Sequence, residues 1–131
     1  MPTRPLSPHL SVYKMSRYTL VTSILNRFTG VALSAGLGLL VYWLVAVAGG
    51  ARSQAQAMRL LSLPALRILY FGLILAFCYH LVAGIRHLVW DTGRGLERAQ
   101  SRRSTWLVAI VSLALALGIV YWAGLAAAGG P

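Results

Sequence analysis

The sequence predicts an all-α membrane protein with three transmembrane helices. Of the 131 residues, 58% are hydrophobic and only 11% are charged, a balance outside the range of soluble globular domains. Residues 28–48, 68–85 and 105–128 contain no Asp, Glu, Lys or Arg. At about 1.5 Å per helical residue, the shortest stretch covers about 27 Å, close to the hydrocarbon thickness of a bilayer. We therefore expect residues 1–131 to form one integral membrane domain.

The first part of the chain predicts an arm followed by a helix. Residues 1–17 contain Pro2, Pro5 and Pro8, which disfavour a long helix and suggest an extended N-terminal arm lying over a surface. We expect the first helix over residues 18–49, with its transmembrane part at about 28–48. Small residues recur every fourth position within it, at Gly30, Ser34 and Gly38 and again at Ala32 and Gly36, which predicts faces for close helix packing.

The rest of the chain predicts two further helices. Gly49 and Gly50 end the first helix, and we expect a short connection without a motif before the second helix at residues 64–90. A charged turn at residues 97–103 then leads to the third helix at residues 105–128. Cys78, the only cysteine, excludes an internal disulfide and is expected to be a small core residue.

Basic residues predict the orientation. Lys and Arg are more numerous in the N-terminal segment and the second loop than in the first loop and the tail, which places the N-terminus in the cytoplasm and the C-terminus in the periplasm. The net charge of +10 does not predict a nucleic-acid partner, because the basic residues stand at helix ends and in loops facing lipid headgroups. No cleavable signal or transit peptide is recognisable, so we expect a multi-pass protein of a bacterial inner membrane.

His80 is the most informative residue, because it lies within an uncharged stretch, roughly 9 Å of helix from Arg86. An ionisable group at that depth is costly unless it faces protein and has a partner. Gly84, one turn away on the same face, leaves room for a bulky flat group such as haem. The alternative is a histidine hydrogen-bonded to a carbonyl or hydroxyl of a neighbouring helix.

Further candidate residues lie near the cytoplasmic ends of the first two helices. Ser23 and Arg27 are four residues apart and present a hydroxyl and a guanidinium on one side of the first helix. Taken alone, Arg27 and Arg86 are most simply interfacial anchors. We expect His87 to pair with Asp91 at i+4. His80 and His87 project the same way about 10 Å apart and cannot both bind one iron, so a second axial ligand must come from another chain.

Three motifs together resemble a known family. They are Arg4-Pro-Leu-Ser-Pro-His-Leu10, Ser23-Ile-Leu-Asn-Arg-Phe-Thr-Gly30 and His80-Leu-Val-Ala-Gly-Ile-Arg-His-Leu-Val-Trp-Asp91. The chain is similar over its whole length to the cytochrome b large membrane-anchor subunits of succinate dehydrogenase, respiratory complex II. The resemblance implies a membrane anchor without catalysis of its own, packed with a second, small anchor subunit around haem b. It also implies a flavoprotein subunit that oxidises succinate and an iron–sulfur subunit that passes the electrons to ubiquinone.

Carried over by motif, the resemblance implies that His80 is an axial haem ligand and so binds the haem iron. Ser23 and Arg27 match the serine and arginine of the ubiquinone pocket, and Arg27 also matches a residue near the haem propionates. Asn26 departs from the family, which commonly has a histidine near a propionate at this position.

Three other functions compete with this expectation. The first is a haem-free structural anchor, and the second is the anchor of a fumarate reductase. The third is a transporter subunit with His80 as a proton relay, which would call for further intramembrane acids that the sequence lacks.

Overall fold

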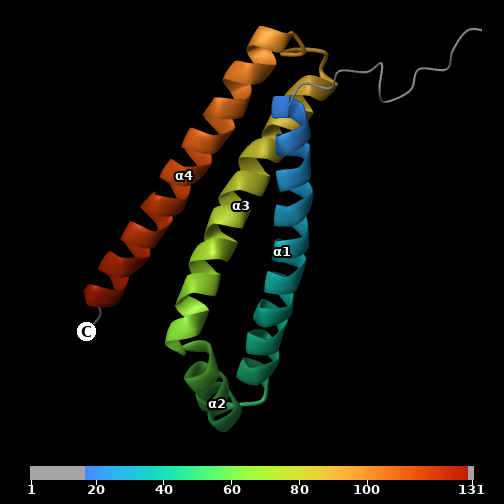
Figure 1. The fold of residues 1–131 in the computed structure, drawn as a ribbon. Helices are drawn as coiled ribbons and strands as arrows, with labels where there is room; N and C mark the ends of the chain where they lie inside the picture. Colours follow the sequence, from blue (N-terminus) through green and yellow to red (C-terminus); the bar gives the residue numbers. More distant parts are fainter. Residues whose placement is uncertain (1–16, 130–131) are drawn as a thin grey trace, which may run out of the picture.

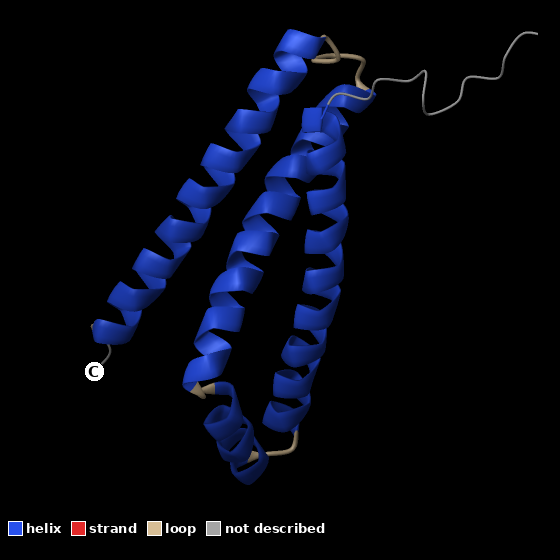
Figure 2. Cartoon of the chain, viewed as in Figure 1, coloured by secondary structure: helices blue, strands red, loops and turns tan. Residues whose placement is uncertain are grey.

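The computed structural model of the chain describes residues 17–129, which form four helices and no strand (Figures 1 and 2). The helices are α1 (Arg17–Ala48), α2 (Ala51–Leu61), α3 (Pro64–Asp91) and α4 (Arg98–Ala128). The predicted N-terminal arm lies outside the described residues except for Arg17, which begins α1. Among the described residues, α1, α3 and α4 are long and apolar enough to cross a membrane. The predicted class, an all-helical protein with three transmembrane helices, is confirmed.

Two details of the predicted chain are wrong. The connection after α1 is not a plain loop, because residues 51–61 form the short helix α2. It buries Ala57, and the carbonyl of its last residue, Leu61, accepts a 2.9 Å hydrogen bond from the Tyr70 hydroxyl. The charged segment before the last span is not a turn throughout, because α4 begins at Arg98. Arginine favours helices, and no Gly or Pro interrupts residues 98–105.

Glycines mark the two ends where the chain reverses. Gly50 has φ +89° between α1 and α2, and Gly93 and Gly95 both have φ +77° between α3 and α4. Such positive φ values are strained for residues with a Cβ atom. The reversals place the start of α1, the end of α3 and the start of α4 at one end of the bundle (Figure 1). We call it the basic end, because Arg94, Arg98, Arg102 and Arg103 lie there.

Helix α3 lies between α1 and α4, and α4 leans away from it toward the C-terminus (Figure 1). The α3/α4 contact buries Cys78 and Ser112, and the hydroxyl of Ser112 donates to the Cys78 carbonyl at 3.4 Å. Cys78 is 2% exposed, which confirms the expected core position. Beyond Ala116 no residue of α4 up to Gly129 is buried. The three spans therefore meet mainly toward the basic end.

Small residues bring α1 against α3, as the sequence predicted only in part. A Cβ atom on Gly30 would lie 3.3 Å from Cε1 of His80, and one on Gly36 would lie 2.9 Å from Cδ2 of Leu73. Ser34 is exposed, and a Cβ on Gly38 would meet nothing within 4 Å. Of Gly30, Ser34 and Gly38, only Gly30 thus lies close against α3.

Candidate functional site

His80 contacts one turn of α1 through its Nδ1 atom. This nitrogen lies 3.1 Å from Oγ1 of Thr29 and 3.2 Å from the carbonyl oxygen of Asn26. A carbonyl only accepts hydrogen bonds, so the contact with Asn26 is a hydrogen bond in the tautomer that carries the proton on Nδ1. His80 therefore makes the contact with a neighbouring helix that the sequence offered as the alternative to ligation. That contact occupies only one of the two ring nitrogens.

The other ring nitrogen has a different environment. Nε2 of His80 has no hydrogen bond to any residue in 17–129. A Cβ atom placed on Gly84, one turn further along α3, would also meet nothing within 4 Å. The position of Gly84 is therefore open, as the sequence predicted.

Asn26 adds an unsatisfied polar atom beside this position. Its Oδ1 atom is buried without a hydrogen-bond partner among the described residues. Buried amide oxygens rarely remain unpaired in native proteins, and each one calls for an explanation. A donor from outside the described residues would satisfy this atom.

Ser23 and Arg27 stand on the flank of α1 adjacent to the His80 contact. At 100° per residue, they follow Asn26 and Gly30 around the helix. Ser23 is half-buried and Arg27 is exposed. A shallow pocket of about 300 Å³ lies next to Arg27, lined by Ile24, Arg27, Phe28 and Val31, and Ser23 does not line it. The structure thus places the two residues within about one turn of Asn26 along α1.

Arg86 is not the interfacial anchor that the sequence suggested. Its side chain is only 7% exposed. Nε donates to the hydroxyl of Ser104 at 2.9 Å, Nη1 to that of Thr22 at 3.3 Å and Nη2 to that of Thr105 at 3.1 Å. Nη2 also donates to the backbone carbonyl and the hydroxyl of Ser101, at 3.1 and 3.3 Å. Arg86 therefore joins α3 to both α1 and α4, and all these partners are neutral oxygens.

The predicted pairing of His87 with Asp91 is also wrong. No hydrogen bond or ion pair joins the two side chains in the described part of the chain. His87 instead packs edge-on against Trp90, with ring centroids 5.4 Å apart and an interplanar angle of 87°. Asp91 is exposed, where water competes for its carboxylate.

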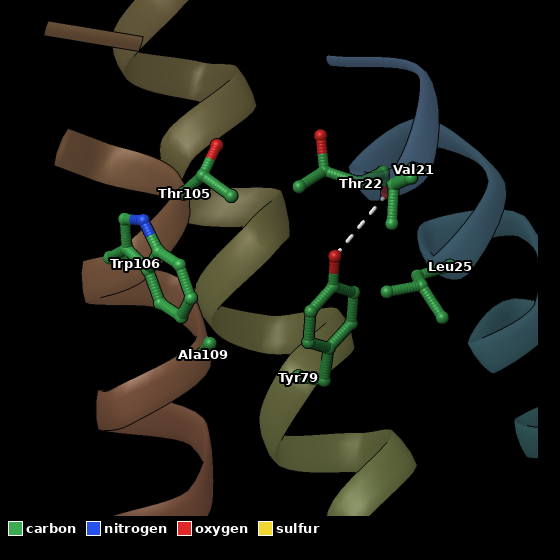
Figure 3. A pocket seen from close by; sticks show the side chains of 7 residues that line it. All are labelled: Val21, Thr22, Leu25, Tyr79, Thr105, Trp106 and Ala109. Atoms are coloured by element: carbon green, nitrogen blue, oxygen red, sulfur yellow. Dashed lines mark hydrogen bonds between the residues drawn. The ribbon is translucent and has the colours of Figure 1, made fainter. Parts of the chain in front are cut away.

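A second pocket, of about 390 Å³, lies where α1, α3 and α4 meet near the basic end (Figure 3). Its lining is almost wholly apolar and comes from all three helices: Val21, Thr22, Leu25, Tyr79, Thr105, Trp106 and Ala109. The Tyr79 hydroxyl donates to the Thr22 carbonyl at 3.4 Å. By helical position, Val21 and Leu25 lie on the opposite flank of α1 from Ser23 and Arg27. This pocket is therefore separate from the one at Arg27.

Four residues of these contacts were not predicted from the sequence: Thr22, Thr29, Ser104 and Thr105. The sequence nevertheless contains a pattern that indicates these residues. Thr22, Asn26 and Thr29 are spaced i, i+4 and i+7, which places three polar residues along one side of an apolar helix. Ser101, Ser104, Thr105 and Ser112 form a similar line on α4. Such polar lines within apolar spans indicate which face meets another helix.

Comparisons with known proteins bear on this arrangement. Residues 1–119 match the model of the succinate dehydrogenase/fumarate reductase transmembrane subunit family. The chain belongs to this family. It is 41% identical over 114 residues to the succinate dehydrogenase cytochrome b556 subunit of Paracoccus denitrificans, covering 87% of each chain. It is 39% identical over 118 residues to the mitochondrial succinate dehydrogenase cytochrome b560 subunit of Bos taurus, covering 88% of this chain and 69% of that one.

Membership confirms the resemblance drawn from the motifs. A third relative, the cytochrome b556 subunit of Rickettsia prowazekii, is 36% identical over 114 residues, covering 87% of this chain and 88% of that one. The chain is thus a multi-pass membrane subunit of the succinate dehydrogenase cytochrome b type. In this transmembrane subunit, His80 and the turn at Asn26 and Thr29 join two of the three spans.

Proposed function

We propose that this chain is the haem-b-binding anchor subunit of a succinate:quinone oxidoreductase and helps to form its ubiquinone-reduction site. The supporting observation is the state of the two ring nitrogens of His80. Nδ1 is hydrogen-bonded to α1, and Nε2, with no partner in residues 17–129, keeps a lone pair for iron. The open space at Gly84 lies on the same face.

The residues present fit a haem. Axial histidines commonly donate their other ring N–H to a carbonyl or carboxylate, which fixes the ring. Asn26 presents a buried unpaired amide atom close by, and its carboxamide supplies either a donor or an acceptor to a propionate. When bound, haem b supplies one-electron redox chemistry between iron(III) and iron(II). Within residues 17–129 the remaining histidine is His87, seven positions along the same helix face, so the second axial ligand comes from the small anchor subunit.

The exposed apolar surface supports a multisubunit assembly. In the most apolar 18-residue stretch of α1, only 6% of the residues are buried. In the corresponding stretches of α3 and α4, 17% are buried. Three apolar helices with so few buried residues leave wide faces open to lipid and to a second anchor subunit. We place the assembly in a bacterial inner membrane. Its flavoprotein subunit oxidises succinate, and its iron–sulfur subunit delivers the electrons at the basic end.

Ser23 and Arg27 are the proposed quinone-binding groups of this chain. Ubiquinone reduction takes up two electrons and two protons and places negative charge on the quinone oxygens. An exposed guanidinium beside a pocket of about 300 Å³ provides charge-assisted hydrogen bonds to such an oxygen. The Ser23 hydroxyl, one turn away, provides a second donor. Arg27 also lies next to Asn26 in the sequence, within reach of a haem propionate.

Two alternatives make different predictions. A haem-free structural anchor of the same complex would contain no b-type haem. The family description also covers fumarate reductase, whose anchor would show electron flow from quinol to fumarate in preference to the reverse. The open side of His80 favours a haem-binding anchor over a haem-free one.

The test is haem content per assembled complex. The complex is purified through an affinity tag on this chain from cells expressing the wild type, His80→Ala or His87→Ala, and haem b is assayed as its pyridine haemochrome. We expect one haem per complex in the wild type and in His87→Ala, and a loss of nearly all haem in His80→Ala. Full haem content in an assembled His80→Ala complex would contradict the assignment.

A further inference from the structure

The side chain of Thr29 lies between His80 and the backbone of its own helix. Its Oγ1 atom is 2.9 Å from the Leu25 carbonyl, 2.9 Å from the Asn26 carbonyl and 3.1 Å from Nδ1 of His80. A hydroxyl has one hydrogen and two lone pairs. The hydrogen is directed to the carbonyls, which can only accept, so a lone pair of Oγ1 is directed to Nδ1.

This arrangement gives the Nδ1–H group of His80 two acceptors on one turn of α1. One is the Asn26 carbonyl at 3.2 Å and the other is the Thr29 hydroxyl. Both acceptors lie close to Nδ1, so the proton stays on this nitrogen and the ring plane is held against α1. The absence of a side chain at Gly30 allows the close approach, because a Cβ there would lie 3.3 Å from Cε1 of the ring.

We propose that Thr29 is a positioning residue that fixes the tautomer and plane of the His80 imidazole and thereby lowers the reduction potential of the haem. The proposal rests on the proposed function, in which His80 binds the haem iron. An imidazole whose N–H donates hydrogen bonds is a more basic ligand through its other nitrogen. A more basic axial ligand favours iron(III) over iron(II). Removing the Thr29 acceptor therefore raises the potential.

Three variants separate this role from simple helix packing. Thr29→Val keeps the branched shape and removes the hydroxyl, and Thr29→Ser keeps the hydroxyl. Ser34→Ala is the matched control, because the Ser34 hydroxyl also donates to the carbonyl four residues earlier, Gly30, at 3.0 Å but is exposed and makes no hydrogen bond to His80. Each is measured in the whole purified complex.

The readouts are the haem midpoint potential, from an optical redox titration, and the g-values of the oxidised low-spin haem in electron paramagnetic resonance. We expect an upward shift of the potential and altered g-values in Thr29→Val. Thr29→Ser should restore values near the wild type, and Ser34→Ala should match the wild type in both. A Thr29→Val complex with full haem, the wild-type potential and wild-type g-values would overturn the proposal.

Further outcomes are also decisive. If Thr29→Val yields little complex, Thr29→Ala replaces it, because the smaller side chain introduces no new contact. An assembled Thr29→Ala complex with full haem and a raised potential supports the proposal, and one with full haem and the wild-type potential overturns it. If both variants lose the partner subunits, Thr29 acts in helix packing and the proposal is overturned. A wild-type complex without haem would instead refute the proposed function itself, and the haem assay of the wild type identifies that case.

Discussion

The guanidinium carbon of Arg86 lies 4.0 Å from the centre of the Trp90 ring, one turn further along α3. The ring covers one face of the cation, and hydroxyls from α1 and α4 surround its edge. A buried cation is costly unless its donors are satisfied. The donors of Arg86 find their partners only when α1, α3 and α4 are packed together. Arg86 therefore links the three spans near the basic end.

We predict that Arg86→Lys destabilises the bundle. A lysine ammonium has three donors at one point and cannot reach hydroxyls on both α1 and α4 as the planar guanidinium does. Each lost hydrogen bond from a charged donor costs about 1.5–3 kcal/mol. Thermal unfolding of the purified complex should show a lower midpoint for Arg86→Lys and no change for Arg94→Lys, in the exposed loop after α3. Equal midpoints for the two variants would contradict the linking role.

We predict that Tyr70→Phe loosens α2. The Tyr70 hydroxyl donates to the Leu61 carbonyl at the end of α2, and this bond ties α2 to α3. Its loss should cost about 1 kcal/mol, which raises the equilibrium constant for opening of the last turn of α2 about fivefold. Hydrogen exchange of the α2 amides measures that opening, with Tyr42→Phe on the exposed side of α1 as control. Unchanged exchange of the α2 amides in Tyr70→Phe would show that the hydroxyl does not hold α2 against α3.

We predict that Gly30→Ala changes the haem signal while Gly38→Ala does not. The new Cβ at position 30 would lie 3.3 Å from Cε1 and 3.8 Å from Nδ1 of His80. The imidazole must then move by a few tenths of an ångström, which alters the geometry of the axial ligand. At Gly38 the new Cβ meets nothing within 4 Å. The low-spin haem g-values should shift only for Gly30→Ala, and equal spectra would show that the ring tolerates the contact.

We predict that Ser23→Ala and Arg27→Leu impair quinone reduction without impairing succinate oxidation. Loss of a charge-assisted hydrogen bond costs about 1.5–3 kcal/mol, which corresponds to about tenfold or more in rate. Succinate-to-ubiquinone activity should fall accordingly, while succinate oxidation with an artificial acceptor persists. Arg52→Leu on α2, away from the basic end, is the control. Parallel loss of both activities would indicate failed assembly instead.

The spans were predictable from the sequence because charge is excluded from them, and this pattern does not depend on tertiary contacts. The small residues were harder to interpret, because spacing alone does not show which member of a series meets a neighbour. A Cβ at Gly30 would meet His80, and one at Gly38 would meet nothing within 4 Å. The helix α2 was missed because it is only 11 residues long and follows two glycines, although its sequence is amphipathic.

The residues around the site were predictable only in part. The motifs supplied His80, Ser23 and Arg27, and the depth of His80 in an apolar helix marked it independently. Arg86 was assigned to the interface because a charged residue near a helix end usually extends to water. The serines and threonine of α4 that bind it are more than ten positions away in the sequence. Only the turn between α3 and α4 brings them together, and spacing within one helix cannot reveal such a contact.

The most direct test of the central claim is an optical difference spectrum of the wild-type complex purified through this chain. The succinate-reduced spectrum minus the air-oxidised spectrum should show the α-band of a b-type haem. That result would establish both the cofactor and its connection to a succinate-oxidising partner. A complex that shows no haem band with succinate or with dithionite would contradict the account and favour a haem-free anchor.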